Sequence, residues 1–381
     1  MNASAARKPL ITANMVTFAR LVPMPLVAWF FYEGHYWTAI ILGTAIGCTD
    51  FIDGHLARKH GPTVLGGLMD PIADKVFIAF AYLPFADPRL HFFPDWFFAP
   101  AWLIAAMFVR ELVVTALRSS YKRRDMSMKT SYLGKVKTWT QMQGIGTMMM
   151  LILLADKRTA IIAVLATMAA APLVAMVVFY AVKKKLWRGA LIMSGITGAL
   201  IPVYLSEGLP LLLVVTLCGI VALTWASGLD YLIGGLRQLR GRGDMDRFDS
   251  VRIIGAIALP FLLMAALNAH TASPWFLVTI LSLELAVGGL DNLLAHHKAA
   301  SLAGPWALRV LGTSLLIGAG LLLQHRGEAS LAEYAVMAAV AVSLIGSAYE
   351  FWRGRSYYLD SDKREKRDPM LGAVGDQQSA T

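Results

Sequence analysis

Four aspartates lie within 25 residues of a chain that is otherwise strongly apolar: Asp50, Asp53, Asp70 and Asp74. On a helix, the first two share a face because they are three residues apart, and the last two share a face because they are four apart. Gly61-Pro62, between the two pairs, predicts an end to the first helix and a turn back of the chain. Two neighbouring helices could therefore aim four carboxylates at one point.

Such a cluster needs a partner for its charge. One carboxylate deep in a bilayer costs about 2.5–3.5 kcal/mol on insertion scales, and several like charges together cost more or become protonated. A divalent cation removes this repulsion, and oxygen ligands suit Mg²⁺ or Mn²⁺. Two ions fit four carboxylates and suit phosphate chemistry, so we expect a two-metal site.

The residues between the aspartates argue against the alternative that these carboxylates only cap helices at the cytoplasmic surface. Gly54 and Ala57 are small enough to let a ligand approach the helix backbone. Arg58 adds a guanidinium that can hold a phosphate. Gly66 precedes Asp70 by one helical turn. The stretch therefore indicates a phosphate-binding site.

The same stretch resembles the signature of the CDP-alcohol phosphotransferases. Its eight specified positions read D-x₂-D-G-x₂-A-R-x₇-G-x₃-D-x₃-D. A match over so many positions is far more specific than a lone glycine motif. The resemblance implies an integral-membrane enzyme that moves a phosphatidyl group from a CDP-linked lipid to an alcohol and releases CMP.

The resemblance also implies a role for each matched residue. Asp50, Asp53 and Asp70 would bind the metals, and Asp74 would complete the metal site and act as the general base. The CDP-lipid would be held by the same region and by the start of the first span, through Asp50, Asp53, Gly54, Ala57, Arg58, Gly66, Asn14 and Thr17.

Three further stretches bear on the alcohol. ANMVTFARLVP (13–23) on the first span contains Asn14, Thr17 and Arg20. VRELVVTALRSSYKRR (109–124) contains Arg110 and Arg118, and LGKVKTWTQMQ (133–143) contains Lys135 and Lys137. Arg110 sits inside an apolar run and needs an anion. Because Glu111 points about 100° away on a helix, we expect a phosphate rather than Glu111 beside Arg110.

These stretches are similar to the bacterial phosphatidylglycerophosphate synthases within the family. The resemblance implies glycerol 3-phosphate as the acceptor, with its phosphate held by Arg110, Arg118, Lys135 and Lys137. Inositol phosphate, serine or phosphatidylglycerol would be the alternative acceptors. The family resemblance also suggests a homodimer.

The composition predicts an all-α, polytopic membrane protein. The chain is 57% hydrophobic and 16% charged over 381 residues, with a mean hydropathy of +0.56. Apolar runs of about 20 residues recur and each can span a bilayer. We expect about twelve spans, near residues 10–32, 36–57, 66–86, 97–119, 135–155, 159–182, 189–206, 209–235, 251–270, 274–296, 304–323 and 331–352.

The net charge of +10 is better explained by topology and anionic lipid heads than by nucleic acid, because the basic residues lie in short loops and tails. Threading twelve spans with the N-terminus inside places the basic loops in the cytoplasm, with Lys157-Arg158 as the exception. We expect a multi-pass protein of the inner membrane, with its active site facing the cytoplasm.

The chain divides into a transferase-like domain, a C-terminal module and a tail. Residues 1–244 form the expected catalytic domain, in which 156–207 is read as a two-span insertion. The alternative is that 159–182 is the true sixth helix of the family core. Residues 245–358 form four further spans of unknown role, and 359–381 a charged cytoplasmic tail. We expect these four spans to be an appended module outside the catalytic core.

Two acids of that module lie on one helix face, seven residues apart. We expect Glu284 to pair with Arg309 or His270, and Asp291 to be interfacial. The chain shows neither a convincing internal repeat nor a pair of broken midplane helices, which disfavours a transporter. The intact set of four aspartates disfavours a lipid-binding scaffold without catalysis.

Overall fold

The computed structural model describes residues 13–60, 64–124, 126, 132–184, 186, 188–229, 232–235, 237, 246–297 and 301–358. The side chains of residues 13, 14, 50, 51, 53–60, 132–139, 183 and 188 lie outside this description. Within the described ranges every long element is a helix. The all-α prediction is therefore confirmed for this part of the chain.

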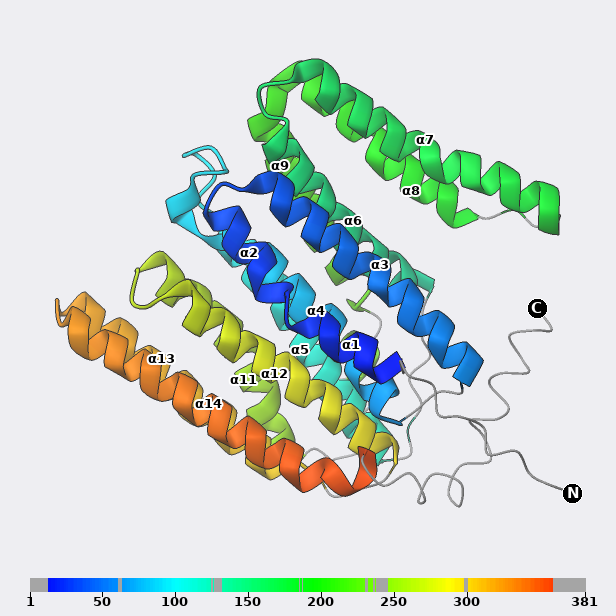
Figure 1. The fold of residues 1–381 in the computed structure, drawn as a ribbon. Helices are drawn as coiled ribbons and strands as arrows, with labels where there is room; N and C mark the ends of the chain where they lie inside the picture. The colour runs from blue at the N-terminus through cyan, green and yellow to red at the C-terminus, as the bar shows by residue number, and fades with distance from the viewer. Residues whose placement is uncertain are drawn as a thin grey trace, which may run out of the picture.

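The helices follow one another with short connections (Figure 1). Their bounds are α1 Ala13–Leu21, α2 Met24–Tyr32, α3 Tyr36–His60, α4 Val64–Ala86, the short 3₁₀ helix η1 Pro88–Leu90, α5 Pro100–Arg123, α6 Tyr132–Leu153, α7 Arg158–Lys183, α8 Arg188–Gly198, α9 Leu200–Ala226, α11 Arg247–Asn268, α12 Pro274–His296, α13 Ala303–His325 and α14 Ala329–Tyr358.

The described residues contain 8 segments long and apolar enough to cross a membrane. They are α1 with α2, α5, α7, α8 with α9, and each of the last four helices. Large apolar side chains remain exposed on these helices, such as Val177 at 63% and Ile345 at 72%. Such surface suits lipid rather than water. The chain is therefore a multi-pass membrane protein, although this count does not reach the expected twelve spans.

Helix α5 lies at the centre of the bundle. Most of its span, 78%, is buried inside the protein, against 11% for α7. It packs against α4, α9, α11 and α12. Helices α1, α2 and α12 cover α4, while α3 packs on α1 and α2. The helix that carries Asp70 and Asp74, α4, and the helix that carries Arg110 and Arg118, α5, therefore adjoin one another in the interior.

Helices α7 and α8 form a hairpin that extends away from the bundle (Figure 1). Helix α9 returns the chain to the bundle, where it packs against α5 and α6. Gly208 interrupts α9 with φ +78° and ψ −166°, a conformation reserved for glycine. The break coincides with the boundary expected between the spans 189–206 and 209–235.

The last four helices pack closely on the transferase-like helices. Helix α11 lies along α5, and α12 lies against both α4 and α5. Two glycines of α12 allow this approach: a Cβ atom on Gly288 would come within 2.9 Å of the Thr115 side chain, and one on Gly289 within 2.8 Å of Ile72. Small residues let membrane helices approach in this way. The four helices therefore lie directly against helices of the expected catalytic domain, and their place outside the catalytic core stays a prediction.

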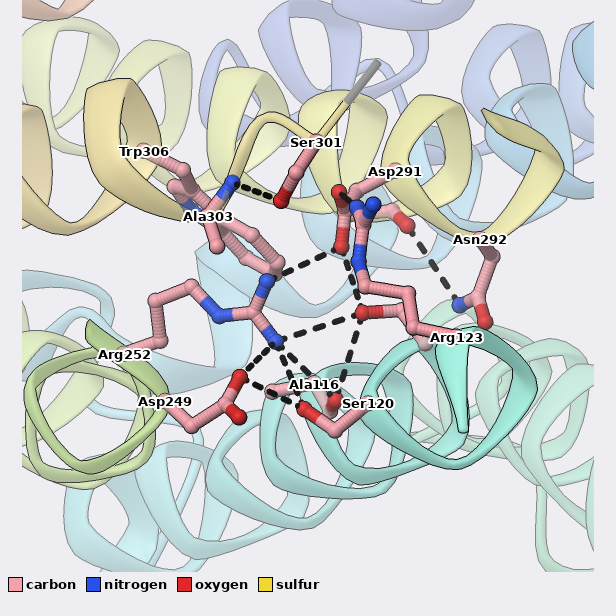
Figure 2. A network of polar contacts seen from close by, with 12 residues as sticks. Ala116, Ser120, Arg123, Asp249, Arg252, Asp291, Asn292, Ser301, Ala303 and Trp306 are labelled. Atoms are coloured by element: carbon pink, nitrogen blue, oxygen red, sulfur yellow. Dashed lines mark hydrogen bonds and ion pairs between the residues drawn. The ribbon is translucent and has the colours of Figure 1, made fainter. Parts of the chain in front are cut away.

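Glu284 and Asp291, the two acids of the C-terminal module considered above, are both paired. Glu284 forms an ion pair with Arg309, which confirms one of its two expected partners. The expectation for Asp291 is wrong, because this residue is 0% exposed and is paired with Arg123 of α5 and Arg252 of α11 (Figure 2). A position near the end of a helix does not make a residue interfacial when neighbouring helices extend beyond it.

At the opposite end of the bundle, Asp87 joins α2 to the turn after α4. Its Oδ2 accepts a hydrogen bond from the Tyr32 hydroxyl at 2.7 Å, and its Oδ1 accepts from Arg89 Nε at 2.8 Å. Burial alone would raise the pKa of the Asp87 carboxyl, but the bonds from Arg89 and Tyr32 outweigh burial and hold that pKa below its usual range.

We predict that Asp87→Asn destabilises the protein by about 1–3 kcal/mol, because Tyr32 and Arg89 lose a buried, charged acceptor. Thermal unfolding in detergent at neutral pH measures this as a lower melting temperature. The exposed Asp95→Asn in the same loop is the matched control. The lowered pKa stabilises the fold above the ordinary aspartate value of 3.8, and this contribution is lost as pH falls through the lowered pKa. Equal melting temperatures at neutral pH would contradict the prediction.

Candidate functional site

The two aspartates of α4 lie one turn apart and half-buried, facing α1. The Thr17 hydroxyl donates to Asp70 Oδ1 at 2.9 Å. Arg20 places Nη1 at 3.6 Å from Asp74 Oδ1, with the arginine side chain 2% exposed and the aspartate side chain 33% exposed. Because Thr17 and Arg20 are three residues apart, one face of α1 reaches both carboxylates.

The other predicted metal and CDP-lipid residues lie on α1, α3 and α4. Asp50, Asp53, Gly54, Ala57 and Arg58 are all on α3, which packs beside α1. Their side chains, and that of Asn14, lie outside the description, whereas Gly66 begins the turn of α4 before Asp70.

The described side chains contain no group of three or more metal-binding residues, since only two of the four aspartates are among them. These two still fit a metal site. Both supply carboxylate oxygens, which Mg²⁺ and Mn²⁺ prefer. The Thr17 hydroxyl orients the Asp70 carboxylate from outside, as partners of metal ligands do.

A cavity of about 150 Å³ opens beside Asp74. Polar side chains line part of it, from Asp74, Lys75, Glu111 and Gln141, and apolar ones line the rest, including Phe108 and Leu285. Space of this size holds several water molecules or a small polar group. The half-exposed Asp74 carboxylate can therefore meet a small polar molecule in a partly enclosed space.

Arg110 has a protein partner that the sequence argument rejected. Its Nη1 lies 3.2 Å from Glu111 Oε1, and its Nη2 donates to Ser227 Oγ at 3.0 Å. The expectation that Glu111 points away from Arg110 is wrong, because two long side chains can bend toward each other across 100° of helix. Burial of Arg110 therefore does not by itself require a phosphate.

Of the remaining predicted acceptor contacts, Arg118 is described and partly exposed on α5. It lies two turns beyond Arg110, about 12 Å along the helix axis. Lys135 and Lys137 lie at the start of α6, and their side chains are outside the description. The structure thus places Arg110 and Arg118 on α5 and the other two basic residues on α6, and a shared phosphate site of all four stays a prediction.

Two polar residues beside the cavity were missed from the sequence. Lys75 donates to Thr115 Oγ1 of α5 at 2.9 Å. Gln141 donates to Glu111 Oε1 at 3.4 Å and to Thr224 Oγ1 at 3.3 Å. The signal that could have found Lys75 is its position: a lysine inside a membrane helix suggests a function by default.

Comparison with known proteins gives a family match. The family model described as CDP-alcohol phosphatidyltransferase matches residues 10–179, which include the whole predicted signature. No solved structure matches the chain.

Curated relatives match the same region. A protein of Sodalis glossinidius named CDP-diacylglycerol–glycerol-3-phosphate 3-phosphatidyltransferase is 34% identical over 140 residues, which are 35% of this chain and 74% of the relative. A protein of the same name from Escherichia coli K12 is 33% identical over 135 residues, 34% of this chain and 71% of the relative. A probable phosphatidylglycerophosphate synthase of Mycobacterium tuberculosis is 39% identical over 141 residues, 35% of this chain and 63% of the relative. The resemblance identified from the sequence is confirmed.

We predict that Thr17→Val weakens binding of Mn²⁺ to the purified protein about tenfold, because loss of an outer partner costs a ligand its orientation. Titration of the purified protein with Mn²⁺, followed by electron paramagnetic resonance, measures the change. Thr279→Val is the matched control, since the Thr279 hydroxyl bonds only within its own helix, to Trp275 O at 2.7 Å. Unchanged affinity in Thr17→Val would show that this hydroxyl does not support a metal ligand.

Proposed function

Because the chain belongs to the CDP-alcohol phosphatidyltransferase family, we propose that it transfers the phosphatidyl group of CDP-diacylglycerol to glycerol 3-phosphate. The products are phosphatidylglycerophosphate and CMP, and the reaction belongs to phosphatidylglycerol and cardiolipin biosynthesis. The names of relatives from three bacteria support this acceptor over inositol phosphate, serine or phosphatidylglycerol.

The observation that carries the proposal is the arrangement around Asp70 and Asp74. Two carboxylates one turn apart are held from α1 by Thr17 and Arg20, and the second of them lies beside a cavity that polar side chains line in part. Members of the family generally use divalent metal ions. We propose Mg²⁺ or Mn²⁺, two ions, held by Asp50, Asp53, Asp70 and Asp74.

The chemistry divides between the metals and the protein. Bound divalent ions neutralise the diphosphate and stabilise the leaving CMP. Asp74 accepts the proton of the acceptor hydroxyl, whose oxygen then bonds to the phosphorus that carries the diacylglycerol as the bond from that phosphorus to CMP breaks. Arg20 Nη1 lies 3.6 Å from Asp74 Oδ1 and holds that carboxylate from the α1 side.

The remaining residues bind the two substrates. Gly54, Ala57, Arg58 and Gly66, with Asn14 and Thr17, line the site of the CDP-lipid. Arg118, Lys135 and Lys137 hold the acceptor phosphate. Arg110 reaches the same region from deeper in α5, where Glu111 and Ser227 hold its guanidinium in place.

We also propose twelve spans, an inner-membrane location and an active site on the cytoplasmic side. Helices α3, α4 and α6 add to the eight apolar segments, and the 38-residue segment Gly189–Ala226 is long enough to cross twice, turning at Gly208. About 20 residues suffice for each crossing. A homodimer is part of the same proposal.

The proposed domain division follows the expected one. Residues 1–244 form the transferase domain, 245–358 the four-span module and 359–381 the tail. The family match ends at residue 179, within α7, yet it is the later α9 that packs against α5 and α6. This packing supports the reading of 156–207 as an insertion.

We predict that the purified protein releases CMP from CDP-diacylglycerol when given glycerol 3-phosphate and Mg²⁺, and that EDTA stops the reaction. Asp74→Asn should abolish turnover and leave CDP-lipid binding largely intact, because the amide cannot accept the proton. CMP release and equilibrium binding of the CDP-lipid measure the two effects separately. Full activity in EDTA, or an active Asp74→Asn protein, would refute the mechanism. Faster reaction with another alcohol would refute the acceptor.

We predict that Arg118→Ala raises the KM for glycerol 3-phosphate at least about tenfold, because a charged hydrogen bond to phosphate is lost. The KM for CDP-diacylglycerol should change little. Steady-state kinetics with each substrate varied in turn gives both values. The exposed Arg353→Ala is the control for loss of one positive charge near the same membrane surface. An equal rise in both KM values would exclude an acceptor-specific role for Arg118.

A further inference from the structure

We infer that the last four helices position the acceptor-binding helix α5, through buried ion pairs from Asp249, Arg252 and Asp291. The inference rests on the proposed function, because it assigns the effect to the acceptor side of that reaction. It gives the C-terminal module a role in catalysis, although its helices hold none of the predicted catalytic residues.

The ion pairs meet the C-terminal end of α5 from two other helices, α11 and α12 (Figure 2). From α12, Asp291 accepts hydrogen bonds from Ser119 and Arg123. From α11, Asp249 accepts from Ser120 Oγ at 2.8 Å and from Arg124 Nη2 at 2.7 Å. Two pairs of polar residues one turn apart, Ser119 with Ser120 and Arg123 with the capping Arg124, are thus bound to the module.

Arg252 ties the two sides together. It is 1% exposed, lies 3.1 Å from Asp291 Oδ2 and 3.2 Å from Asp249 Oδ1, and donates to Ala116 O at 3.2 Å. The last bond reaches the backbone of α5 itself. One buried guanidinium therefore fixes α5 relative to both α11 and α12.

The bonded face of α5 differs from the face that meets the candidate site. Ala116, Ser119, Ser120 and Arg123 cluster on one side of the helix, whereas Glu111, Thr115 and Arg118 lie about a third of a turn away. On that second side, Thr115 contacts Lys75 and Glu111 lines the cavity beside Asp74. The ion pairs of the module are thus made on a different face of α5 from the one that lines the cavity, although α12 also contacts Thr115.

The ion-paired residues of this region form two clusters with opposite excesses of charge. In the first, Arg123, Arg124 and Arg252 exceed Asp249 and Asp291 by one positive charge. A second cluster in the module has the opposite excess, since Arg309 alone pairs with both Glu284 and Glu350.

Trp306 links the two clusters. It donates to Glu284 Oε2 at 2.8 Å, and its ring lies 4.9 Å from the Arg252 guanidinium carbon. In apolar surroundings an unbalanced charge is costly. The two clusters therefore favour one position relative to each other, and the bonds to α5 extend this constraint to that helix.

The consequence for catalysis follows from geometry. Arg118 follows Thr115 by one turn on the substrate face and precedes Ser119 and Ser120 directly, so any rotation or shift of this end of α5 moves Arg118. A displacement of about 1 Å at a substrate-positioning group can cost up to about a hundredfold in rate. None of these printed bonds is made to α1, α3 or α4, the helices that carry the proposed CDP-lipid site.

The test is a kinetic comparison in the full-length protein. Asp291→Asn should raise the KM for glycerol 3-phosphate about tenfold and leave the KM for CDP-diacylglycerol within about twofold. Asp246→Asn is the matched control: Asp246 is exposed just before α11 and makes no side-chain capping bond. A purely structural role would instead lower the amount of folded protein and leave both KM values of the remainder unchanged.

A second variant keeps the test valid if Asp291→Asn folds poorly. Asp291→Asn combined with Arg123→Gln removes one charge of each sign and so restores the balance. The yield of folded protein should recover, while the acceptor KM stays raised because the link between α5 and α12 is still broken. A double variant with a wild-type acceptor KM would overturn the inference, as would parallel rises in both KM values.

The two proposals can fail separately. A wild-type protein that releases CMP with another alcohol refutes the proposed acceptor, and the same variants are then measured with that alcohol. A selective rise in its KM would still support the positioning role. Unchanged values in both variants would refute that role whichever acceptor is used.

Discussion

The constraint on which this structure depends is that a charge placed among apolar helices must be neutralised where it lies. Only 16% of the residues are charged, and most of those inside the bundle have partners on another helix. Asp74 has Arg20, Asp291 has Arg123 and Arg252, and Glu284 has Arg309. Each of these pairs fixes one helix relative to another, so the charges set the arrangement of helices that lipid alone would leave loose.

The same constraint explains why α5 is central. A helix with polar groups on two faces cannot turn either face to lipid, and α5 has Glu111, Thr115 and Arg118 on one face and Ser119, Ser120 and Arg123 on another. Neighbours must cover both, and α4, α9, α11 and α12 pack around α5. The glycines of α12 bring its backbone near enough for Asn292 to donate to Thr115 O at 3.3 Å.

The sequence predicted those features that depend on local pattern. The helical class follows from the apolar runs. The break near Gly208 follows from a polar, flexible point within such a run. The Glu284–Arg309 pair follows because an acid inside a membrane needs a basic partner. It failed where the outcome depends on distant partners. Asp291 finds Arg123 in a segment 168 residues earlier, and only the fold reveals that meeting. The prediction that Arg110 and Glu111 do not pair failed for a different reason. The angle between two positions on a helix gives the directions of their Cβ atoms, not the positions of the ends of long side chains.

Buried ion pairs are a poor means of gaining stability, because the loss of hydration offsets much of their attraction, and apolar residues of similar size often serve as well. A network of four arginines and four acids at the junction of α5, α11, α12, α13 and α14 therefore needs another reason to exist. What such a network does well is to select one arrangement: each displacement of α5 would leave a charge unpaired. The family match covers residues 10–179 and stops before these last helices. The pairs from Asp249, Arg252 and Asp291 all converge on a helix inside the matched region. Additional helices could pack on any lipid-facing surface of a transferase core without forming ion pairs to it. The ion pairs to α5, in contrast, require that helix to stay in one position.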